Sequence, residues 1–307
     1  MIIPSFPRCL AATLALASLT GAALAQTIPS PLVHYTFDEG SGATAANSGS
    51  AADGDITLNR GTNTAVSWGT LNNTPSGAGY ALSFDGTNAG DSNTGSNVGA
   101  GTNVTELTDG FSSLTTSLWV NISGLAASPT RLISVASSGT NGFSFRLENT
   151  TLTSVKLQLW VNGASVTTTN SIDVSSGWVF LAVSYDGTAT SNNVNFYAGG
   201  TDTGTPLLQL DAAARTLNEG SVASLSIASR DYRLRLGSGQ EYSGNRSPAG
   251  LIDDVRIYDS VLSADQIAAI RMDTLVPVPE PATAAAFAGL AALLLAGLAA
   301  ARRTSRH

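Results

Sequence analysis

Between residues 32 and 258 the chain alternates short apolar runs with turn dipeptides, and this pattern limits the fold more than any other feature. The runs at 81–84, 156–161 and 178–185 end at Asp-Gly, Asn-Gly and Asp-Gly. Such dipeptides close β-hairpins, and there is little helical periodicity before residue 263. The sequence therefore predicts a single all-β domain, either a sandwich or a barrel.

These runs predict strands, and the longer polar stretches between them predict loops. The strands are expected at 32–37, 81–84, 117–122, 131–136, 143–147, 156–161, 178–185, 193–198, 232–236 and 251–258. The loops are expected at 59–79, 87–105 and 201–225. One helix is predicted to begin at Ser263, because Ser263 and Gln266 have capping-box spacing and Ile267 and Ile270 give an apolar face.

Several kinds of chemistry are disfavoured by the composition. The net charge is −7 with a single lysine, Lys156, which argues against nucleic-acid binding because that requires many cations. The one cysteine, Cys9, lies in a segment that we expect to be removed. The two histidines are His34 and His307, so a Ser-His-Asp mechanism or a multi-histidine metal site would depend on His34 alone.

Both ends of the chain have the pattern of targeting segments. Residues 1–25 combine a basic residue, an apolar run and Ala-Leu-Ala, which predicts a cleaved signal peptide; a retained membrane helix is the alternative. A proline-rich linker at 275–281 precedes 282–301, twenty residues whose helix would be about 30 Å long and would span a bilayer. The basic tail at 302–307 predicts a cytoplasmic end.

Pro279, Glu280 and Pro281, the apolar span and the arginine-rich tip follow one another in order. This arrangement resembles the PEP-CTERM sorting signal of Gram-negative bacteria. The resemblance implies an exosortase-type enzyme as a partner. It also implies export to the cell envelope or extracellular matrix, with transient or stable anchoring by the helix.

Five segments of the body form an ordered set. They are Phe37–Gly42, Ala81–Gly86, Phe111–Ile122, Gly177–Gly187 and Gly250–Tyr258, the last followed by Leu262–Ile267. Together they resemble the laminin-G-like, concanavalin A-like jelly-roll domain of exported bacterial proteins. The resemblance implies a two-sheet antiparallel jelly-roll sandwich over residues 27–274, and it implies binding or adhesion with carbohydrate as the leading ligand class.

The same resemblance implies one structural Ca²⁺, held by Asp38 or Glu39 together with Asp253. Val255 and Ile257 share the strand parity of Asp253, so we expect its base near the core, where a carboxylate needs a partner. The alternative is that Asp253 caps backbone or pairs with an arginine.

Trp160 is the candidate for sugar stacking. Leu157, Leu159 and Val161 share one face, so the indole points the other way with Gln158 and Asn162, whose amides suit hydroxyl groups. The alternative is that this second face packs under a loop. Tyr242 is a further candidate in a loop, whereas Trp119 and Trp178 are expected to be core.

Catalysis is not expected. A retaining glycosidase needs two carboxyl groups about 5–5.5 Å apart, and no glutamate of the body has another acid two or four residues away in a strand. The sequence thus favours a non-catalytic binding protein over two alternatives. These are a structural matrix or biofilm protein without a specific ligand, and a glycan-active hydrolase.

Overall fold

The computed structural model describes residues 27–60, 63–87, 98–126, 129–137, 140–225, 233–239 and 246–275. The signal peptide at 1–25, the sorting motif at 279–281 and the span at 282–301 lie outside these ranges. Within them, neither helix combines the length and apolar character that crossing a bilayer demands.

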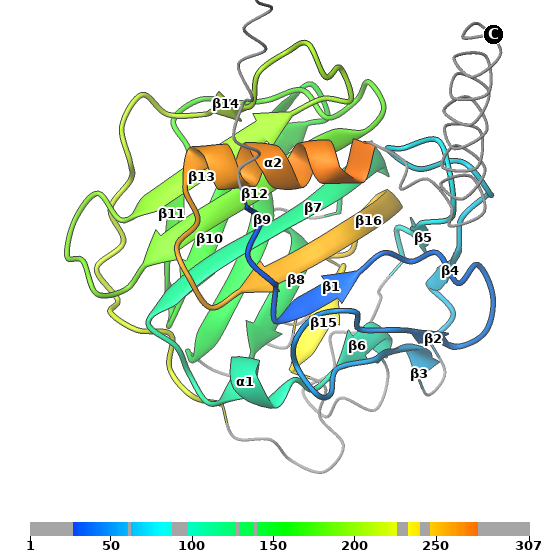
Figure 1. Cartoon of the computed structure of the whole chain (residues 1–307), viewed down its shortest axis with the longest axis horizontal. Helices are drawn as coiled ribbons and strands as arrows, with labels where there is room; N and C mark the ends of the chain where they lie inside the picture. Colours follow the sequence, from blue (N-terminus) through cyan, green and yellow to red (C-terminus); the bar gives the residue numbers. More distant parts are fainter. Residues whose placement is uncertain are drawn as a thin grey trace, which may run out of the picture.

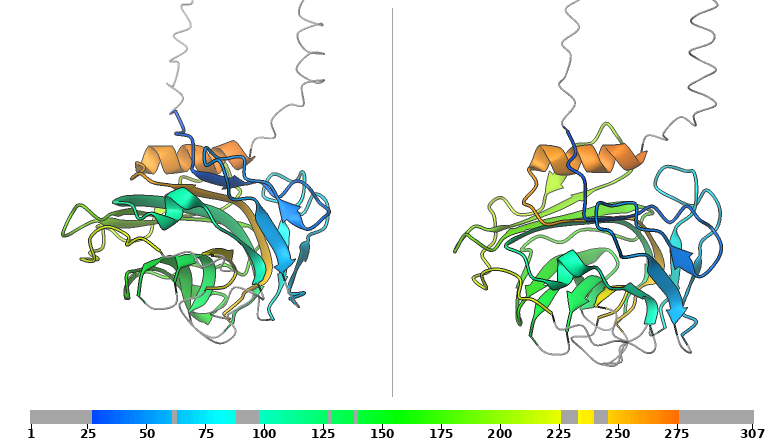
Figure 2. Two further views of the ribbon diagram at one scale, coloured as in Figure 1. Left: turned by 90° about the horizontal axis from the view of Figure 1, so that it is seen from below. Right: turned by 60° about the horizontal axis from the view of Figure 1, so that its bottom comes forward.

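Two antiparallel eight-stranded sheets lie face to face and form a sandwich, as predicted (Figures 1 and 2). The first sheet, sheet A, has β1 paired with β16 beside the main strand path. In order across that path its strands are β14 (Leu208–Gln209), β13 (Val194–Gly199), β12 (Val179–Asp186), β7 (Ser113–Gly124), β16 (Ala249–Tyr258), β5 (Leu82–Asp85) and β4 (Val66–Trp68), with β1 at Val33–Tyr35.

The second sheet, sheet B, supplies the opposite layer. In order its strands are β11 (Ala164–Thr167), β10 (Ser154–Val161), β9 (Gly142–Thr151), β8 (Thr130–Ala136), β15 (Leu234–Leu236), β6 (Val98–Thr102), β3 (Ile56–Arg60) and β2 (Thr44–Ala45). Alternate residues of both sheets meet in one apolar core, which includes Leu118 and Leu181 from sheet A and Phe145 and Leu159 from sheet B. Burial of this common layer is what holds the two sheets together.

All ten predicted strands are present, and six short ones add to them. Of these six, β4, β6 and β14 lie inside stretches predicted to be loops, and β3 extends into the first of those stretches. The short turn at Asn162 and Gly163 closes the β10–β11 hairpin, with φ of 48° and 101°. Positive φ at both positions is the geometry for which Asn-Gly is favoured.

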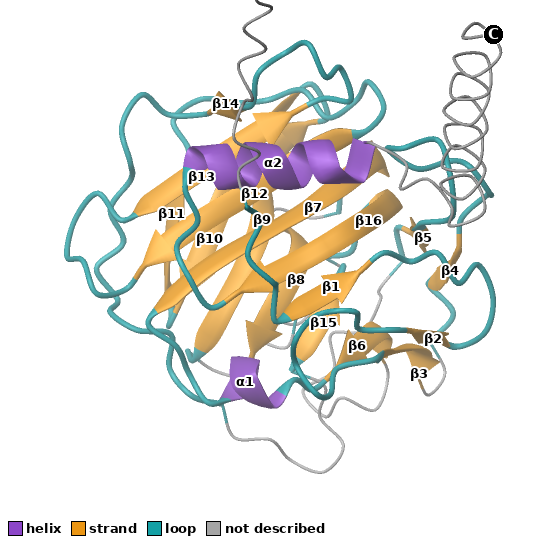
Figure 3. Cartoon of the chain, viewed as in Figure 1, coloured by secondary structure: helices purple, strands orange, loops and turns teal. Residues whose placement is uncertain are grey.

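Besides the short α1 (Thr105–Thr108), the fold contains α2 (Ala264–Leu275), which lies across the outer face of sheet A (Figure 3). The predicted capping box is formed: the Gln266 backbone N–H donates to Ser263 Oγ at 3.2 Å, and the Ser263 N–H donates to Gln266 Oε1 at 3.0 Å. Ile267 and Ile270 pack on Trp119, which is fully buried. The prediction that Trp119 is core is correct, but it packs under α2, outside the layer between the sheets.

A β-bulge in β16 changes which way its acidic residues face. The register against β7 shifts between Asp253 and Arg256, and Asp254 has φ of 43°. Asp253 pairs with the outward-facing Trp119, whereas Val255 packs in the core between the sheets. The parity argument that placed Asp253 with Val255 was therefore wrong, because the extra residue of a bulge resets the alternation.

Candidate functional site

The outer face of sheet B carries Trp160, as the strand parity predicted. The strand register aligns polar side chains on this face in two rows. One row contains Ser165, Trp160, Ser144, Ser134 and Arg235. The other contains Thr167, Gln158, Arg146 and Arg131.

Trp160 is only 8% exposed, and the Arg146 guanidinium lies over its ring at 4.9 Å from the centroid. A cation over an indole face is an attractive arrangement, and it occupies the surface on which a sugar would stack. The expectation of an open aromatic platform thus does not describe this geometry, and the alternative of a covered second face describes it better.

Gln158 links the polar groups around the tryptophan. Its Nε2 donates to Glu148 Oε2 at 2.9 Å and to Thr167 Oγ1 at 3.1 Å, and its Oε1 accepts from Arg146 at 3.5 Å. Gln158 is buried, whereas Glu148, Lys156 and Thr167 are half-buried. The reachable part of the cluster is therefore its edge at β9, β10 and β11, where hydrogen-bonding groups are already held in place.

Asn162 has a structural task. Its Oδ1 accepts from the backbone N–H groups of Gly142 and Ala223, and its Nδ2 donates to the Ser221 carbonyl at 2.7 Å. The amide thereby ties the β10–β11 turn to residues 219–223. Tyr242, the other loop candidate, lies outside the described residues.

The arginines of this face were not singled out from the sequence. Arg131, Arg146 and Arg235 are all buried on the outer side of sheet B. The alternation Phe143-Ser144-Phe145-Arg146 contained the signal, since Phe143 and Phe145 belong to the core and the residues between them face outward. The search for aromatic platforms passed over these charged positions.

The predicted calcium ligands Asp38, Glu39 and Asp253 differ in their burial and in their hydrogen bonds. Asp253 is 5% exposed, and burial, together with the charges of Asp254 and Asp38, raises its pKa well above the usual value. Burial also raises the pKa of Asp38, whose Oδ1 accepts from the Tyr80 backbone N–H. Burial thus disfavours the charged form of both carboxyl groups, and a nearby cation would favour it. Glu39 instead accepts a hydrogen bond from the Ala46 N–H at 2.7 Å.

The adjacent Asp254 is compensated. Its Oδ1 contacts His34 Nε2 at 2.6 Å and Arg256 Nε at 3.0 Å, and its Oδ2 accepts from the Thr274 hydroxyl. Arg256 also pairs with Asp273 at 2.8 Å. The hydrogen bond from His34 and the nearby charge of Arg256 outweigh burial and lower the pKa of Asp254. Arg256, the arginine of the last strand, therefore forms its ion pairs with Asp254 and Asp273 and not with Asp253.

Comparison with protein families now adds to this geometry. Residues 92–268, more than half of the chain, match the Laminin_G_3 model, which describes the concanavalin A-like lectin/glucanases superfamily. The chain belongs to this superfamily. The laminin-G-like resemblance read from the sequence motifs is thereby confirmed. No curated protein sequence matches the chain.

Solved structures show the superfamily fold at low identity. Domain 4 of AbnA, a GH43 extracellular arabinanase from Geobacillus stearothermophilus, solved with arabinotriose, is 18% identical with a TM-score of 0.50. That match covers 80% of this chain and 100% of the other. The binding domain of Paraclostridial Mosquitocidal Protein 1 is 10% identical with a TM-score of 0.52, covering 79% of this chain and 52% of that one.

The superfamily name covers both lectins and glucanases. Whether the acidic side chains are free or already hydrogen-bonded therefore bears on function. Glu39 accepts a backbone hydrogen bond, Glu148 is held by Gln158, and Asp254 is enclosed by His34 and Arg256. Each of these acids is already engaged by groups of the protein. Among the described residues, no group of three or more aspartate, glutamate, histidine or cysteine side chains is arranged so that it could hold a metal ion.

Proposed function

We propose that this protein is an exported, non-catalytic carbohydrate-binding protein, which binds glycan along the edge of sheet B formed by β9, β10 and β11. The observation that carries the proposal is the fixed polar cluster around Gln158. Glu148, Thr167 and Arg146 surround its amide, and Trp160 lies beside them under Arg146. Hydrogen-bonding groups that are held in place lose little freedom on binding, which favours recognition of sugar hydroxyls.

The fold supports this ligand class. AbnA domain 4, which shares the fold, was solved with arabinotriose, and the match in Paraclostridial Mosquitocidal Protein 1 is itself a binding domain. Sugars are therefore the first ligands to test.

Export and sorting form the second half of the proposal. Residues 1–25 would direct secretion, and Pro279, Glu280, Pro281 and the span at 282–301 would direct sorting by an exosortase-type enzyme. The protein would then reside in the envelope or extracellular matrix, where polysaccharide is the partner at hand. The support for this half is the sequence pattern at the two ends.

Calorimetric titration of the purified full-length protein tests the binding. Arabinotriose and the host's extracellular polysaccharide are suitable first ligands, and we expect saturable binding. The Glu148→Gln variant should bind at least about 10-fold more weakly, because it loses a charge-assisted acceptor at the reachable edge. Glu106→Gln, the same change in α1, should bind as the wild type does.

Absence of saturable binding to any glycan, from protein shown to be folded, would sink the proposal. It would instead favour a structural matrix protein without a specific ligand. Hydrolysis of a bound glycan would contradict the non-catalytic assignment.

We also propose one structural Ca²⁺, held by Asp38 and Asp253. Adding Ca²⁺ should then raise the melting temperature of the wild type. In chelator, Asp253→Asn should be more stable than the wild type and more so as the pH rises, because burial raises the pKa of Asp253 and the neutral amide still accepts from the Asp254 N–H. This variant should not respond to calcium. The matched change Asp259→Asn alters an exposed acid and should leave the calcium response intact. A wild type that is indifferent to calcium would rule out the site.

A further inference from the structure

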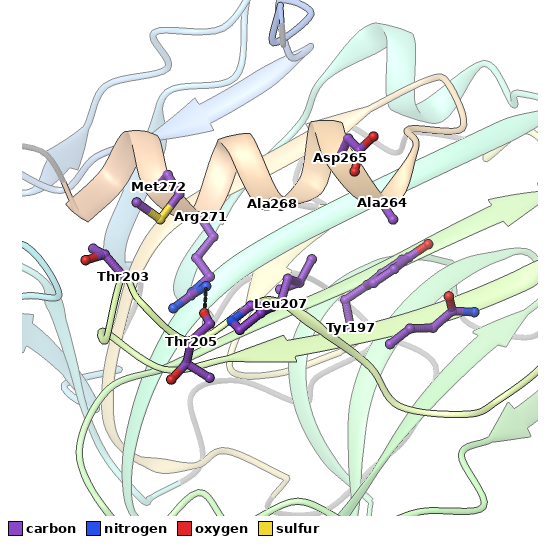
Figure 4. A pocket seen from close by; sticks show the side chains of 11 residues that line it. Tyr197, Thr203, Thr205, Leu207, Ala264, Asp265, Ala268, Arg271 and Met272 are labelled. Atoms are coloured by element: carbon purple, nitrogen blue, oxygen red, sulfur yellow. Dashed lines mark hydrogen bonds between the residues drawn. The ribbon is translucent and has the colours of Figure 1, made fainter. Parts of the chain in front are cut away.

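A pocket of about 430 Å³ lies between α2 and the segment that joins β13 to β14, on the side of the sandwich away from sheet B (Figure 4). Pro206, Leu207 and Met272 give it apolar walls, and Ala268 contributes a small side chain from the helix. Its volume falls in the range of small-molecule sites, which combine apolar walls with a few polar groups. Neither the sequence motifs nor the sheet-B cluster accounts for this pocket.

Arg271 fixes one wall of the pocket. It is 2% exposed, and its guanidinium donates to the backbone carbonyls of Gly200, Asp202 and Thr205. Glycine at 199 permits this approach, since a Cβ there would lie 2.8 Å from Arg271 Nε. The clamp holds the 200–205 segment against α2, so the pocket is formed before any ligand arrives. Arg271 is the one cationic side chain among the described residues that line the pocket, and these hydrogen bonds already engage it.

The polar groups of the pocket include two acceptors, on Asp265 and Gln209, beside the exposed Thr203 hydroxyl, which can donate or accept. Among the described residues, the exposed carboxylate of Asp265 has neither a hydrogen bond nor an ion pair. Gln209 donates through Nε2 to Asn195 Oδ1 at 3.0 Å, which leaves its Oε1 to accept. Sugar hydroxyls are donors of the kind that a carboxylate and an amide oxygen receive.

The charge of the pocket selects among sugars. Asp265 is the available charge, and the body from residue 27 to 275 carries 11 basic and 21 acidic residues. An acidic sugar would meet a negative group without a cation to offset it, and like charges repel. A neutral sugar would meet the Asp265 and Gln209 acceptors and the Thr203 hydroxyl on its hydroxyl side and apolar walls on its C–H side.

We propose that this pocket binds one unit of a neutral saccharide, with Asp265 and Gln209 accepting hydrogen bonds from its hydroxyls and with Pro206, Leu207 and Met272 contacting its C–H face. The proposal rests on the carbohydrate-binding function proposed above and adds a second site, on the opposite sheet from the Gln158 cluster. It specifies the class of sugar that the second site accepts.

Calorimetric titration of the full-length protein with cellotriose, maltotriose and xylotriose, and with trigalacturonate as the acidic counterpart, tests the pocket. We expect at least one neutral trisaccharide to bind and trigalacturonate to bind at least 10-fold more weakly. Asp265→Ala should weaken the neutral ligand at least 10-fold, and Ala268→Leu should abolish its binding at this site by filling the pocket. The matched controls Asp259→Ala and Ala269→Leu change residues that do not line the pocket and should stay within twofold.

The outcomes separate the two proposals. Neutral-sugar binding that both pocket variants leave unchanged but Glu148→Gln weakens would overturn the pocket and retain the sheet-B site. Binding that is stronger for trigalacturonate would overturn the neutral class. No binding of any saccharide by folded protein would overturn both sites. Circular dichroism of each variant shows whether α2 and the sandwich are intact.

Discussion

Replacing Asp254 by Ala is expected to lower the free energy of unfolding by about 3–5 kcal/mol. The substitution removes the acceptor that compensates His34 and Arg256, and the Arg256 side chain is nearly buried. Breaking a buried ion pair from one side is costly, and here it leaves Arg256 with only the exposed Asp273 as a charged partner among the described residues. Thr274 also loses its hydrogen bond to β16 and keeps only the one to the Ile270 carbonyl within the helix, so the end of α2 loosens. Urea denaturation measures the change.

Two further variants separate charge from packing. Asp259→Ala alters an exposed acid just beyond β16 and should change stability by less than about 0.5 kcal/mol. Adding Arg256→Met to Asp254→Ala should recover part of the lost stability, because the buried guanidinium that lost its Asp254 partner is then also removed. A double variant less stable than Asp254→Ala would show that packing, and not charge, governs this site.

Trp119→Ala should cost a similar amount, about 3–5 kcal/mol. Its ring is 0% exposed and meets the edge of Phe180 at a centroid distance of 5.4 Å. It also forms the surface on which Ile267 and Ile270 of α2 rest. Truncation therefore leaves a cavity beneath the helix and removes its main support. Urea denaturation gives the cost, and hydrogen exchange should show the α2 amides losing protection first.

Trp119→Phe keeps a ring at this position and should recover much of the loss. Trp68→Ala is the matched large-to-small change at a half-buried tryptophan whose Nε1 donates to the Gly42 carbonyl, and it should cost less. Equal losses in Trp119→Ala and Trp68→Ala would contradict the special role assigned to the helix–sheet layer.

Strand alternation predicted which side of a strand each residue faces, but not what covers that side. Trp119 and Trp160 both face away from the layer between the sheets, and both are buried. Trp119 lies under α2, and Trp160 lies under Arg146. Such long-range contacts leave no periodic mark in the chain, so a platform could not be distinguished from a packed ring.

The sequence predicted more reliably those features that depend only on residues close together in the chain. Ser263 and Gln266 form their capping box within four residues, and the structure confirms it. Asp253 shows the opposite case, because the bulge after it depends on pairing with β7 and on Asp254 at positive φ. Aspartate tolerates that conformation better than most residues, but nothing in the run 251–258 requires it. The site chemistry around Asp254 was missed for the same reason.

The last turn of α2 has a mechanical consequence for whatever follows residue 275. Thr274 and Asp273 attach this turn to Asp254 and Arg256 of β16, an interior strand of sheet A. Both ends of the described chain, residues 27 and 275, lie on this one side of the sandwich (Figure 2). Tension applied beyond residue 275 therefore passes within one helical turn into a hydrogen-bonded strand. A tether at this end would pull directly on sheet A, and sheet B would lie on the side that bears no direct load.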